Sequence, residues 1–525
     1  MKYKVLIPSA GLGSRLGDLC KNINKALVPI ENKPSICYII EKFPENIEII
    51  VAIGHKGEIL KQFLSIAYPD RKITFVNIDP YQGQGSGLGY TILQCKKYLQ
   101  CPFIFCSNDT ILIENIPAPT TNWMGYAEVK NNEKYRSVIL RPELGLQYVE
   151  KICEKGEKCD SYAYIGLAGI RDYDDFWRYM TSGVNNGAIT IGECYALSNM
   201  KNIHAKKFNW FDTGDLIDLH KASDFFKKSD SPNILQKQDE FIWFVENKVI
   251  KYSIDKEFIK NRLKRVSGIK EYIPKILGYK DNMYSYKFIN GKTISKMLSA
   301  KIFKRFLLWS KDFWKKANLN IEETEQFEKC CMSFYKDKTF KRVEKYFNRF
   351  SYIDSEEIIN DIPVPKLLDL LNKVDWENLS QGIPSRYHGD FHFENILVAE
   401  GGDFVLLDWR QDFAGLEEYG DLYYDLAKLL HGSIVQHDMI DKNLFIIDKD
   451  ADIITFDILR KHKLIECDKI FEDFALEEGY DFEKVKLLTA LIFLNIAPLH
   501  HYPYSEFLFY LGKYQLHNVL ISGGI

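Results

Sequence analysis

The sequence lacks the features that would place the protein in a membrane or on a nucleic acid. No apolar run approaches the roughly 20 residues that a membrane-spanning helix needs. The formal net charge is only −3, and no basic block is long enough to suggest nucleic-acid binding. The first residues, Met1–Lys4, lead directly into an apolar strand without a signal-peptide cleavage region. We therefore expect a cytoplasmic protein that acts on small molecules, and a homo-oligomer is left open.

Cysteine motifs and repeats are missing as well. The 11 cysteines are scattered without a C-x-x-C pair, and Cys330 and Cys331 are adjacent, a spacing that disfavours a bridge between them. This pattern predicts reduced thiols and no structural zinc. No internal repeat or low-complexity tract occurs in the chain.

Length and composition predict more than one folded domain. A chain of 525 residues is too long for one ordinary core, and 46% hydrophobic with 27% charged residues is typical of a globular protein. The polar segment Lys227–Pro232 interrupts the apolar pattern. We place a boundary there, which predicts domains at 1–230 and 231–525, the second with a small lobe at about 235–292 and a large lobe at about 293–525.

The clearest chemical pattern lies in Tyr387–Trp409, which reads as a loop and a two-stranded hairpin with a Gly-Gly turn. Asp390, Asn395 and Asp408 occupy the loop ends of this hairpin. Phosphoryl transfer from ATP requires a carboxylate that accepts the proton of the attacking hydroxyl, and an amide and a second carboxylate that hold Mg²⁺. The alternative is an ordinary hairpin with polar tips.

The H-G-D-x-x-x-x-N spacing with the following Asp-Trp resembles the aminoglycoside phosphotransferase/choline kinase group. This resemblance implies a bilobal, protein-kinase-like α+β fold. It makes Asp390 the catalytic base, Asn395 and Asp408 the Mg²⁺ ligands, and His388 a brace of the loop. Tyr419–Ala427 resembles the family's following helix start, where Asp421 would cap the helix.

The kinase resemblance also assigns nucleotide contacts upstream of the hairpin. Two strands are expected at Phe241–Glu246 and Val249–Tyr252, and Lys251 on the second takes the place of the ATP-contacting lysine, with Lys248 in the turn as the competing candidate. Glu257 is the nearest acidic partner on the next helix. The hinge at Tyr286–Ile289 would bind adenine, so Lys287 and Ile289 are expected to contact nucleotide.

The N-terminal part alternates strands and helices, which predicts an α/β domain with a doubly wound, mixed, Rossmann-like sheet. Its first strand, Lys4–Ile7, leads into a glycine-rich turn whose backbone N–H groups can approach a phosphate closely. Ser9–Leu16 together with Lys25–Ile30 resembles the nucleotidyltransferases that make nucleotide sugars and their CTP-using relatives.

This second resemblance assigns a nucleotide-binding and metal-binding set. Its glycine loop would cradle the triphosphate, and Arg15 and Lys25 would neutralise charge on the transferring and leaving phosphates. Asp109, which ends an apolar strand, and the distant Asp212 would bind one Mg²⁺; each alone is an ordinary turn or cap residue. The remaining expected contacts are Ala10, Gly11, Gly13 and Ser14 for the triphosphate, Gln82, Gly85 and Ser86 for base or sugar (or a turn and helix cap), and Glu150, Lys151 and Asp215 for the substrate.

Together the two resemblances predict a bifunctional enzyme of surface-polysaccharide precursor synthesis that uses Mg²⁺ at both sites, ATP and a second NTP. A kinase would phosphorylate a small hydroxyl acceptor, and the nucleotidyltransferase would convert the monoester. The Glu150–Lys151 and Asp212–Gly214 segments favour a sugar; choline or ethanolamine, giving a CDP-alcohol, is the alternative. A second alternative is that one domain is inactive and regulatory, and the departures at Asn108 and Asp215 point to the N-terminal one.

Overall fold

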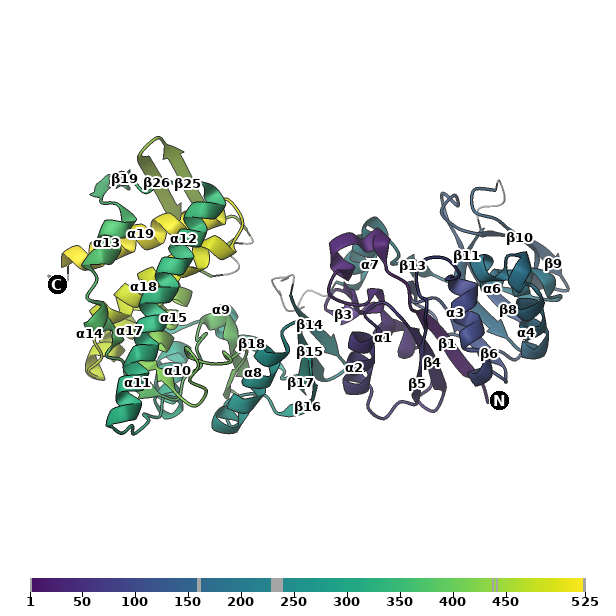
Figure 1. The fold of residues 1–525 in the computed structure, drawn as a ribbon, viewed down its shortest axis with the longest axis horizontal. Helices are drawn as coiled ribbons and strands as arrows, with labels where there is room; N and C mark the ends of the chain where they lie inside the picture. Colours follow the sequence, from purple (N-terminus) through teal and green to yellow (C-terminus); the bar gives the residue numbers. More distant parts are fainter. Residues whose placement is uncertain (1, 158–161, 228–238, 437–438, 441, 523–525) are drawn as a thin grey trace. The chain divides into compact units, whose positions relative to one another are not determined.

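The computed structural model describes residues 2–157, 162–227, 239–436, 439–440 and 442–522, and they form two compact units (Figure 1). Unit 1 comprises 1–256 with 276–287, and unit 2 comprises 257–275 with 288–525. The expected domain boundary at 230/231 lies outside the described residues. The chain thus crosses between the units three times, whereas the sequence suggested one crossing.

Unit 1 is built on a nine-stranded mixed sheet, in the order β5-β4-β1-β6-β11-β8-β12-β10-β9. β1 pairs in parallel with β4 and β6, whereas β11 runs antiparallel to β6 and β8. The expected mixed α/β fold of the N-terminal part is thereby confirmed. The strands are β1 (Lys4–Ser9), β4 (Glu48–Ile53), β5 (Ile73–Asn77), β6 (Phe103–Cys106), β8 (Trp123–Glu128), β9 (Ser137–Glu143), β10 (Leu146–Cys153), β11 (Tyr162–Ile170) and β12 (His204–Lys207).

Helices cover both faces of this sheet because its central strands are apolar on both sides. In β1, Val5 and Ile7 belong to one hydrophobic core and Leu6 belongs to the other. The first core includes side chains of α1, α2 and α7, and the second those of α3, α4 and α6. The bounds are α1 (Ser35–Ile40), α2 (Gly57–Ala67), α3 (Leu88–Gln94), α4 (Tyr173–Ser182), α5 (Ala188–Ile191), α6 (Glu193–Asn199) and α7 (Leu216–Phe226).

The strand order reverses direction at β1, which has β4 on one side and β6 on the other. Loops that follow such neighbouring strands separate at a switch point, and open α/β sheets bind ligands there. The glycine loop follows β1, and Ser107–Asp109 follows β6. A two-stranded ribbon of β7 (Thr110–Leu112) and β13 (Trp210–Asp212) lies beside this edge and brings in Asp212. The short pair β2 (Pro29–Ile30) and β3 (Lys33–Pro34) follows the loop.

A second, four-stranded sheet also belongs to unit 1, although the sequence suggested that it forms the small lobe of the C-terminal domain. Its order is β14-β15-β17-β16, with β14 (Glu240–Val245), β15 (Lys248–Ser253), β16 (Ile276–Lys280) and β17 (Met283–Lys287). Trp243 is fully buried against Phe63 of α2, and its indole donates to the Leu27 carbonyl at 3.1 Å. This apolar face is therefore part of the unit 1 core.

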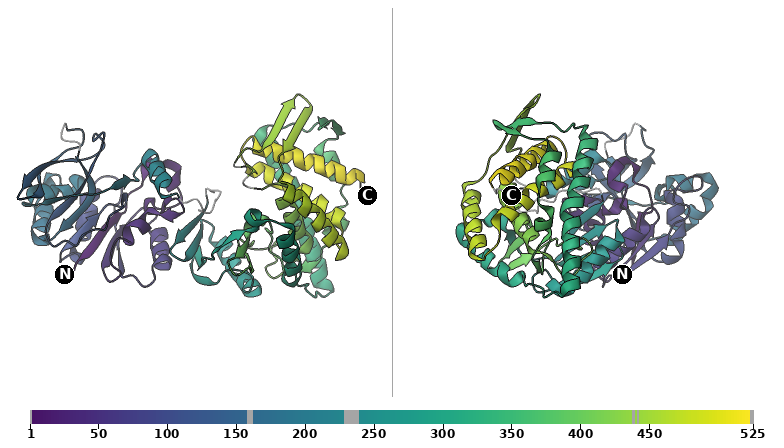
Figure 2. Two further views of the ribbon diagram at one scale, coloured as in Figure 1. Left: turned by 180° about the vertical axis from the view of Figure 1, so that it is seen from behind. Right: turned by 60° about the vertical axis from the view of Figure 1, so that its left-hand side comes forward.

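Unit 2 is mainly helical, and Figure 2 shows its long helices packed together with the projecting hairpin β25–β26. α18 packs against α12, α15 and α19. The helices are α8 (Lys256–Ile269), α9 (Ile294–Met297), α10 (Ala300–Phe313), α11 (Ile321–Met332), α12 (Lys338–Phe350), α13 (Leu367–Lys373), α14 (Trp376–Ser380), α15 (Leu422–Ile434), α17 (His462–Glu477), α18 (Phe482–Ile496) and α19 (Tyr504–Ser522).

Three small sheets complete unit 2, and one of them is the predicted catalytic hairpin. That sheet has the order β18-β22-β23, so the hairpin β22–β23 gains a third strand. The strands of the three sheets are β18 (Gly291–Thr293), β22 (Ile396–Ala399) and β23 (Phe404–Leu406); β19 (Glu357–Ile359), β20 (Ile362–Val364), β25 (Phe445–Asp450) and β26 (Ile453–Ile458); and β21 (Pro384–Ser385) with β24 (Gly420–Asp421).

Two expectations about the whole chain can be compared with the structure. Among the described residues, nine cysteines are free thiols, most of them buried, but Cys153 is disulfide-bonded, which corrects the expectation that every cysteine is reduced. Among the described residues, no helix is both long enough and apolar enough to cross a bilayer.

Candidate functional site

The glycine loop of unit 1 is fixed next to Lys25 by close packing. Gly13 has a φ of 70°, and a Cβ there would lie 2.8 Å from the Cys20 sulfur and 3.0 Å from the Lys25 Cβ. Only glycine tolerates both conditions. The loop continues into a 3₁₀ helix, Ser14–Cys20, rather than the α-helix typical of phosphate loops. Ala10 is buried at the start of the loop, whereas Gly11, Ser14 and Arg15 are exposed.

Asn24, which sequence reasoning missed, connects this loop to the Lys25 segment. Its fully buried amide donates to the carbonyls of Ser9 (2.9 Å) and His55 (2.6 Å), and its Oδ1 accepts from Ala26 N. Lys25 is thus held in a short 3₁₀ turn, Lys25–Leu27, beside the carboxyl end of β1.

Lys25 meets the carboxylate predicted from the distant strand β6. Its Nζ lies 2.5 Å from Asp109 Oδ2, and Ser107 Oγ donates to Asp109 Oδ1 at 2.5 Å. Burial alone would raise the pKa of Asp109, but Lys25 and Ser107 lower it to about 2. Asp109 is therefore a carboxylate at neutral pH.

Asp212 and Arg15 complete this group around Gly214. A Cβ at Gly214 would lie 2.9 Å from Asp212 Oδ1, 3.1 Å from Arg15 Nη2 and 3.3 Å from Asp109 Oδ2. The ribbon register explains the approach, because Asp212 pairs with Thr110, the residue after Asp109. Tyr135 Oη, not anticipated from the sequence, donates to Asp212 Oδ2 at 3.1 Å.

The resemblance implies Mg²⁺ at this group, and the donor set fits. Burial and the adjacent Asp109 carboxylate both raise the pKa of Asp212, as expected for two carboxylates held close together. Carboxylate oxygens are the donors that Mg²⁺ prefers, with its remaining positions taken by water and phosphate oxygens. Asp109 and Asp212 would hold the ion.

The other expected contacts of unit 1 are less well supported by their surroundings. Gln82 and Gly85 lie in an exposed loop, and Ser86 Oγ donates to the Gly83 carbonyl as in a simple turn. Glu150 and Lys151 are exposed on β10, where Lys151 Nζ lies 2.5 Å from Glu157. Among the described residues, no contact joins these side chains to the aspartate pair.

Asp215 has an evident structural role. It caps α7 by accepting from Asp218 N at 3.0 Å and pairs with Lys134 at 2.7 Å. Its assignment to substrate therefore stays a prediction, as do those of the other contacts.

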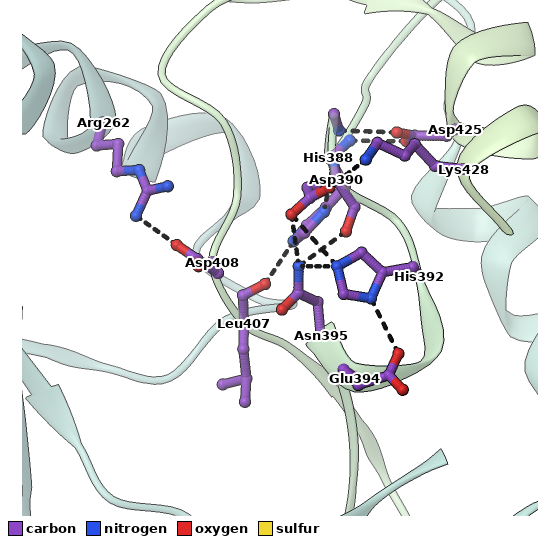
Figure 3. A network of polar contacts seen from close by, with 11 residues as sticks. Arg262, His388, Asp390, His392, Glu394, Asn395, Leu407, Asp408, Asp425 and Lys428 are labelled. Atoms are coloured by element: carbon purple, nitrogen blue, oxygen red, sulfur yellow. Dashed lines mark hydrogen bonds and ion pairs between the residues drawn. The ribbon is translucent and has the colours of Figure 1, made fainter. Parts of the chain in front are cut away.

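Unit 2 places Asp390 in a loop between two cationic side chains (Figure 3). Lys428 Nζ lies 2.8 Å from Asp390 Oδ1, and His392 Nε2 lies 3.4 Å from Oδ2. Burial would raise the pKa of Asp390, but Lys428 and His392 hold it well below its usual range. Burial likewise opposes charging of His392, yet the Asp390 carboxylate raises its pKa to about 9. With 31% of its side chain exposed, Asp390 remains accessible to a hydroxyl group.

Asp425 of α15 holds the backbone of the loop that carries Asp390. Its two oxygens accept from His388 N and Gly389 N, each at 2.7 Å, and Trp314 Nε1 donates at 3.1 Å. The His388 ring lies 2.8 Å from the Leu407 carbonyl, and burial lowers the pKa of His388 to about 3, so the ring is neutral. His388 thus connects the loop to the hairpin.

Asn395 and Asp408 lie on neighbouring segments but face different partners (Figure 3). Asn395 Nδ2 donates to Asp390 Oδ2 at 2.9 Å, and Leu407 N donates to the Asn395 carbonyl at 2.8 Å. Asp408 Oδ1 lies 2.5 Å from Arg262 Nη1 of α8. An amide oxygen and a carboxylate fit the Mg²⁺ that the resemblance implies. Asn395 and Asp408 would hold the ion, with Asp408 binding both Mg²⁺ and Arg262.

The expected ATP contacts upstream are distributed over both units. Lys251 is buried on β15, paired in register with Ile242 and Tyr284. Lys287 ends β17 in unit 1, and Ile289 follows in unit 2. Glu257 lies 3.1 Å from Lys260 on its own helix. The pairing of Glu257 with Lys251 stays a prediction.

The comparisons with known proteins concern the N-terminal part. No family model matches the chain. Over about 45% of the chain, the N-terminal part is homologous to nucleotidyltransferases. It is 25% identical over 263 residues to the bifunctional protein GlmU of Methanococcus vannielii, covering 47% of this chain and 61% of that protein. It is 22% identical to a UTP–glucose-1-phosphate uridylyltransferase of Streptococcus pyogenes, covering 42% of this chain and 87% of that protein.

Coverage of the GlmU relatives is partial: the chain spans between 33% and 61% of the length of three of them. Among solved structures, the CTP:phosphocholine cytidylyltransferase LicC of Streptococcus pneumoniae is 19% identical, with a TM-score of 0.37 over 43% of this chain and all of that one. A UDP-glucose pyrophosphorylase bound to UDP-glucose is 22% identical, with a TM-score of 0.36 over 43% of this chain and 98% of that one.

Proposed function

We propose that the N-terminal part, residues 1–230, transfers a nucleotidyl group from an NTP to a phosphate monoester and releases pyrophosphate. The observation that carries this proposal is the meeting of Asp109, Asp212 and Arg15 around Gly214 at the edge where β1 and β6 end. The homology to nucleotidyltransferases supports it.

The chemistry follows from the positions of these side chains. Bound Mg²⁺ would supply positive charge that draws the triphosphate oxygens together and favours in-line attack at the α-phosphorus. Lys25 and Arg15 are placed to balance charge on the transferring and leaving phosphates, a role typical of preorganised cations. The glycine loop leaves space for the triphosphate, since a Cβ at Gly11 would meet nothing within 4 Å.

A second activity is favoured by the loop of unit 2. We propose that residues 231–525 phosphorylate a small hydroxyl acceptor from ATP, with Asp390 accepting the hydroxyl proton and Asn395 and Asp408 holding Mg²⁺. Lys428 and Asn395 both bind the Asp390 carboxylate and fix its direction. The kinase product would be the monoester that the N-terminal part accepts. A role in making surface-polysaccharide precursors in the cytoplasm is part of the proposal.

For the acceptor we favour a sugar, giving a sugar 1-phosphate and then a nucleotide sugar. The support is the relative named UTP–glucose-1-phosphate uridylyltransferase. The alternative is a small alcohol such as choline, giving a CDP-alcohol. A regulatory, inactive N-terminal part is disfavoured because its two aspartates, Arg15 and Lys25 all meet.

Single substitutions separate the two activities. Asp109→Ala should abolish pyrophosphate release and spare ADP formation, and Asp390→Ala should do the reverse, each by about 10³-fold or more. The assay uses the full chain with ATP, each NTP and a panel of sugars and amino alcohols, with products identified by mass. Loss of both activities in either variant would indicate misfolding, and loss of neither would refute both assignments.

A further inference from the structure

A cluster of four cations lies beside Asp390, and only one of them, Lys428, has a function in the mechanism above. Lys338 and Arg342 lie one turn apart on α12 and therefore share a helix face. Arg410 crosses the catalytic loop: a Cβ at Gly389 would lie 2.6 Å from Arg410 Cδ. Lys428, already paired with Asp390, is the fourth member. We call Lys338, Arg342, Arg410 and Lys428 the cation cluster.

Three members of the cation cluster lack a negative partner. Among the described residues, no carboxylate forms an ion pair or hydrogen bond with the side chain of Lys338, Arg342 or Arg410. Arg410 Nε is buried without any hydrogen-bond partner. Burial and the neighbouring cations hold the pKa of Lys338 well below its usual range. Lys338, Arg342 and Arg410 are each partly buried. Clustered like charges that are partly removed from water without a counter-ion are costly, so their retention points to an anion that binds there.

The aromatic faces next to the cluster are already covered by this chain's own cations. Lys338 Nζ lies 3.9 Å from the ring centroid of Phe334 and 5.5 Å from that of Tyr424. The Arg410 guanidinium lies 5.1 Å from the Phe334 centroid. A quaternary ammonium such as choline would need those faces free and would also be repelled by the cluster. This arrangement argues against a cationic acceptor.

We propose that the acceptor of the unit 2 kinase carries an anionic group, a carboxylate or a phosphate-type group, and that Lys338, Arg342 and Arg410 bind it while its hydroxyl faces Asp390. Arginine and lysine suit this role, because their charge-assisted hydrogen bonds to carboxylates and phosphates are directional as well as strong. The inference rests on the proposed kinase function and narrows the proposed sugar acceptor to one that carries an acidic group, such as a sugar acid or a sugar phosphate.

Three acceptors that share one carbon skeleton test the inference: glycerol, D-glycerate and sn-glycerol 3-phosphate. Full-length protein with saturating ATP and Mg²⁺ should form ADP with at least one of the two anions at a kcat/KM about tenfold or more above glycerol. Arg342→Gln and Lys338→Met should each remove about tenfold of that preference and leave the KM for ATP unchanged. Lys341→Met, on the exposed side of α12, is the matched control and should behave as the wild type.

A binding measurement decides the matter if none of the three is a substrate. In thermal unfolding, D-glycerate or sn-glycerol 3-phosphate should raise the Tm of the wild type and of Lys341→Met but not of Arg342→Gln. Without ligand, Lys338→Met should be at least as stable as the wild type, because burial and the neighbouring cations, which lower the pKa of Lys338, disfavour its charged form; a purely structural lysine would lower the Tm.

The failures are distinguishable. Preference for glycerol over the anions, or equal Tm shifts in all variants, would overturn the inference and leave the kinase intact. A raised KM for ATP in Arg342→Gln with unchanged acceptor preference would assign the cluster to the nucleotide phosphates and likewise overturn it. ADP formation by Asp390→Ala would instead refute the kinase assignment.

Discussion

In unit 1 two carboxylates, Asp109 and Asp212, approach each other around Gly214, whereas in unit 2 a single carboxylate, Asp390, is held between Lys428 and His392. In the first arrangement, burial and the neighbouring Asp109 carboxylate raise the pKa of Asp212. The second has excess positive charge, and the pKa of Asp390 is well below its usual range. The pKa of an aspartate is thus shifted in opposite directions at the two sites, because the neighbouring groups differ.

This difference in neighbouring charges predicts that the two sites bind ligands of opposite charge. A pair of partly buried carboxylates is completed by a cation and then by the phosphates that the cation carries. A carboxylate surrounded by lysine and arginine side chains is completed by an anion, which the cation cluster can bind. Each of the following substitutions removes one charged side chain and tests its part in this comparison.

The largest effect is expected from Lys25→Met in unit 1. Lys25 is 2.5 Å from Asp109 and is the nearest cation to the aspartate pair. Its loss should slow pyrophosphate release by about 10²- to 10³-fold, because a preorganised charge near the phosphates disappears. ADP formation should be unchanged. The exposed Lys21→Met is the control, and a wild-type rate of pyrophosphate release in Lys25→Met would contradict the role of Lys25.

Glu193 extends the comparison to a buried carboxylate without a close cation. It is 4% exposed, one of its oxygens has no hydrogen-bond partner among the described residues, and burial raises its pKa from 4.5 to about 7. A raised carboxylate pKa means that the stability contribution is complete below pH 4.5 and is lost as the pH rises through 7. The loss is about 3 kcal/mol.

Glu193→Gln remains uncharged at every pH and should remove this dependence. The measurement is the unfolding free energy of the full chain between pH 4.5 and pH 8, with the exposed Glu128→Gln as control. Identical pH profiles for the wild type and Glu193→Gln would show that Glu193 keeps its ordinary pKa.

Lys428→Met should reduce ADP formation by about 10- to 100-fold, corresponding to the loss of one charge-assisted contact. Lys428 fixes one oxygen of Asp390, while Asn395 fixes the other. The effect should appear in kcat, and pyrophosphate release should be unaffected. Lys469→Met, an exposed lysine of α17, serves as the control. An unchanged kcat would mean that Asn395 and His392 orient Asp390 without help.

Local patterns in the sequence predicted the hairpin β22–β23 and the strands β14 and β15 closely, because apolar runs and the turn residues between them determine such pairs within a few residues. The turn between β14 and β15 is Glu246–Asn247, so Lys248, which was expected in the turn, begins β15 instead. The meeting of Asp109 with Asp212 was expected only through a family resemblance. Nothing local connects two residues that lie on separate strands, and the β7–β13 ribbon that joins them is a tertiary feature.

One residue that sequence reasoning missed, Lys428, comes from a helix distant in sequence from the Asp390 loop. Lys428 follows Asp425 by three positions on α15, so both share a helix face. A lysine within the nearly continuous apolar run of that helix was the available signal. The assignment of the four-stranded sheet to unit 1 depends on the burial of Trp243 against α2, which no turn or composition shift reveals.

The smallest effect is expected from Arg262→Met on α8. Arg262 is 2.5 Å from Asp408, so it neutralises a carboxylate that is proposed to hold Mg²⁺. Removing the competing cation should lower the Mg²⁺ concentration for half-maximal ADP formation by about three- to tenfold. Lys264→Met, on the same helix and paired at the surface with Glu417, should leave the Mg²⁺ requirement unchanged. A higher Mg²⁺ requirement in Arg262→Met would instead show that Arg262 orients Asp408 for Mg²⁺ binding. A cation would then assist the carboxylate ligand of unit 2, as Lys25 accompanies Asp109 in unit 1.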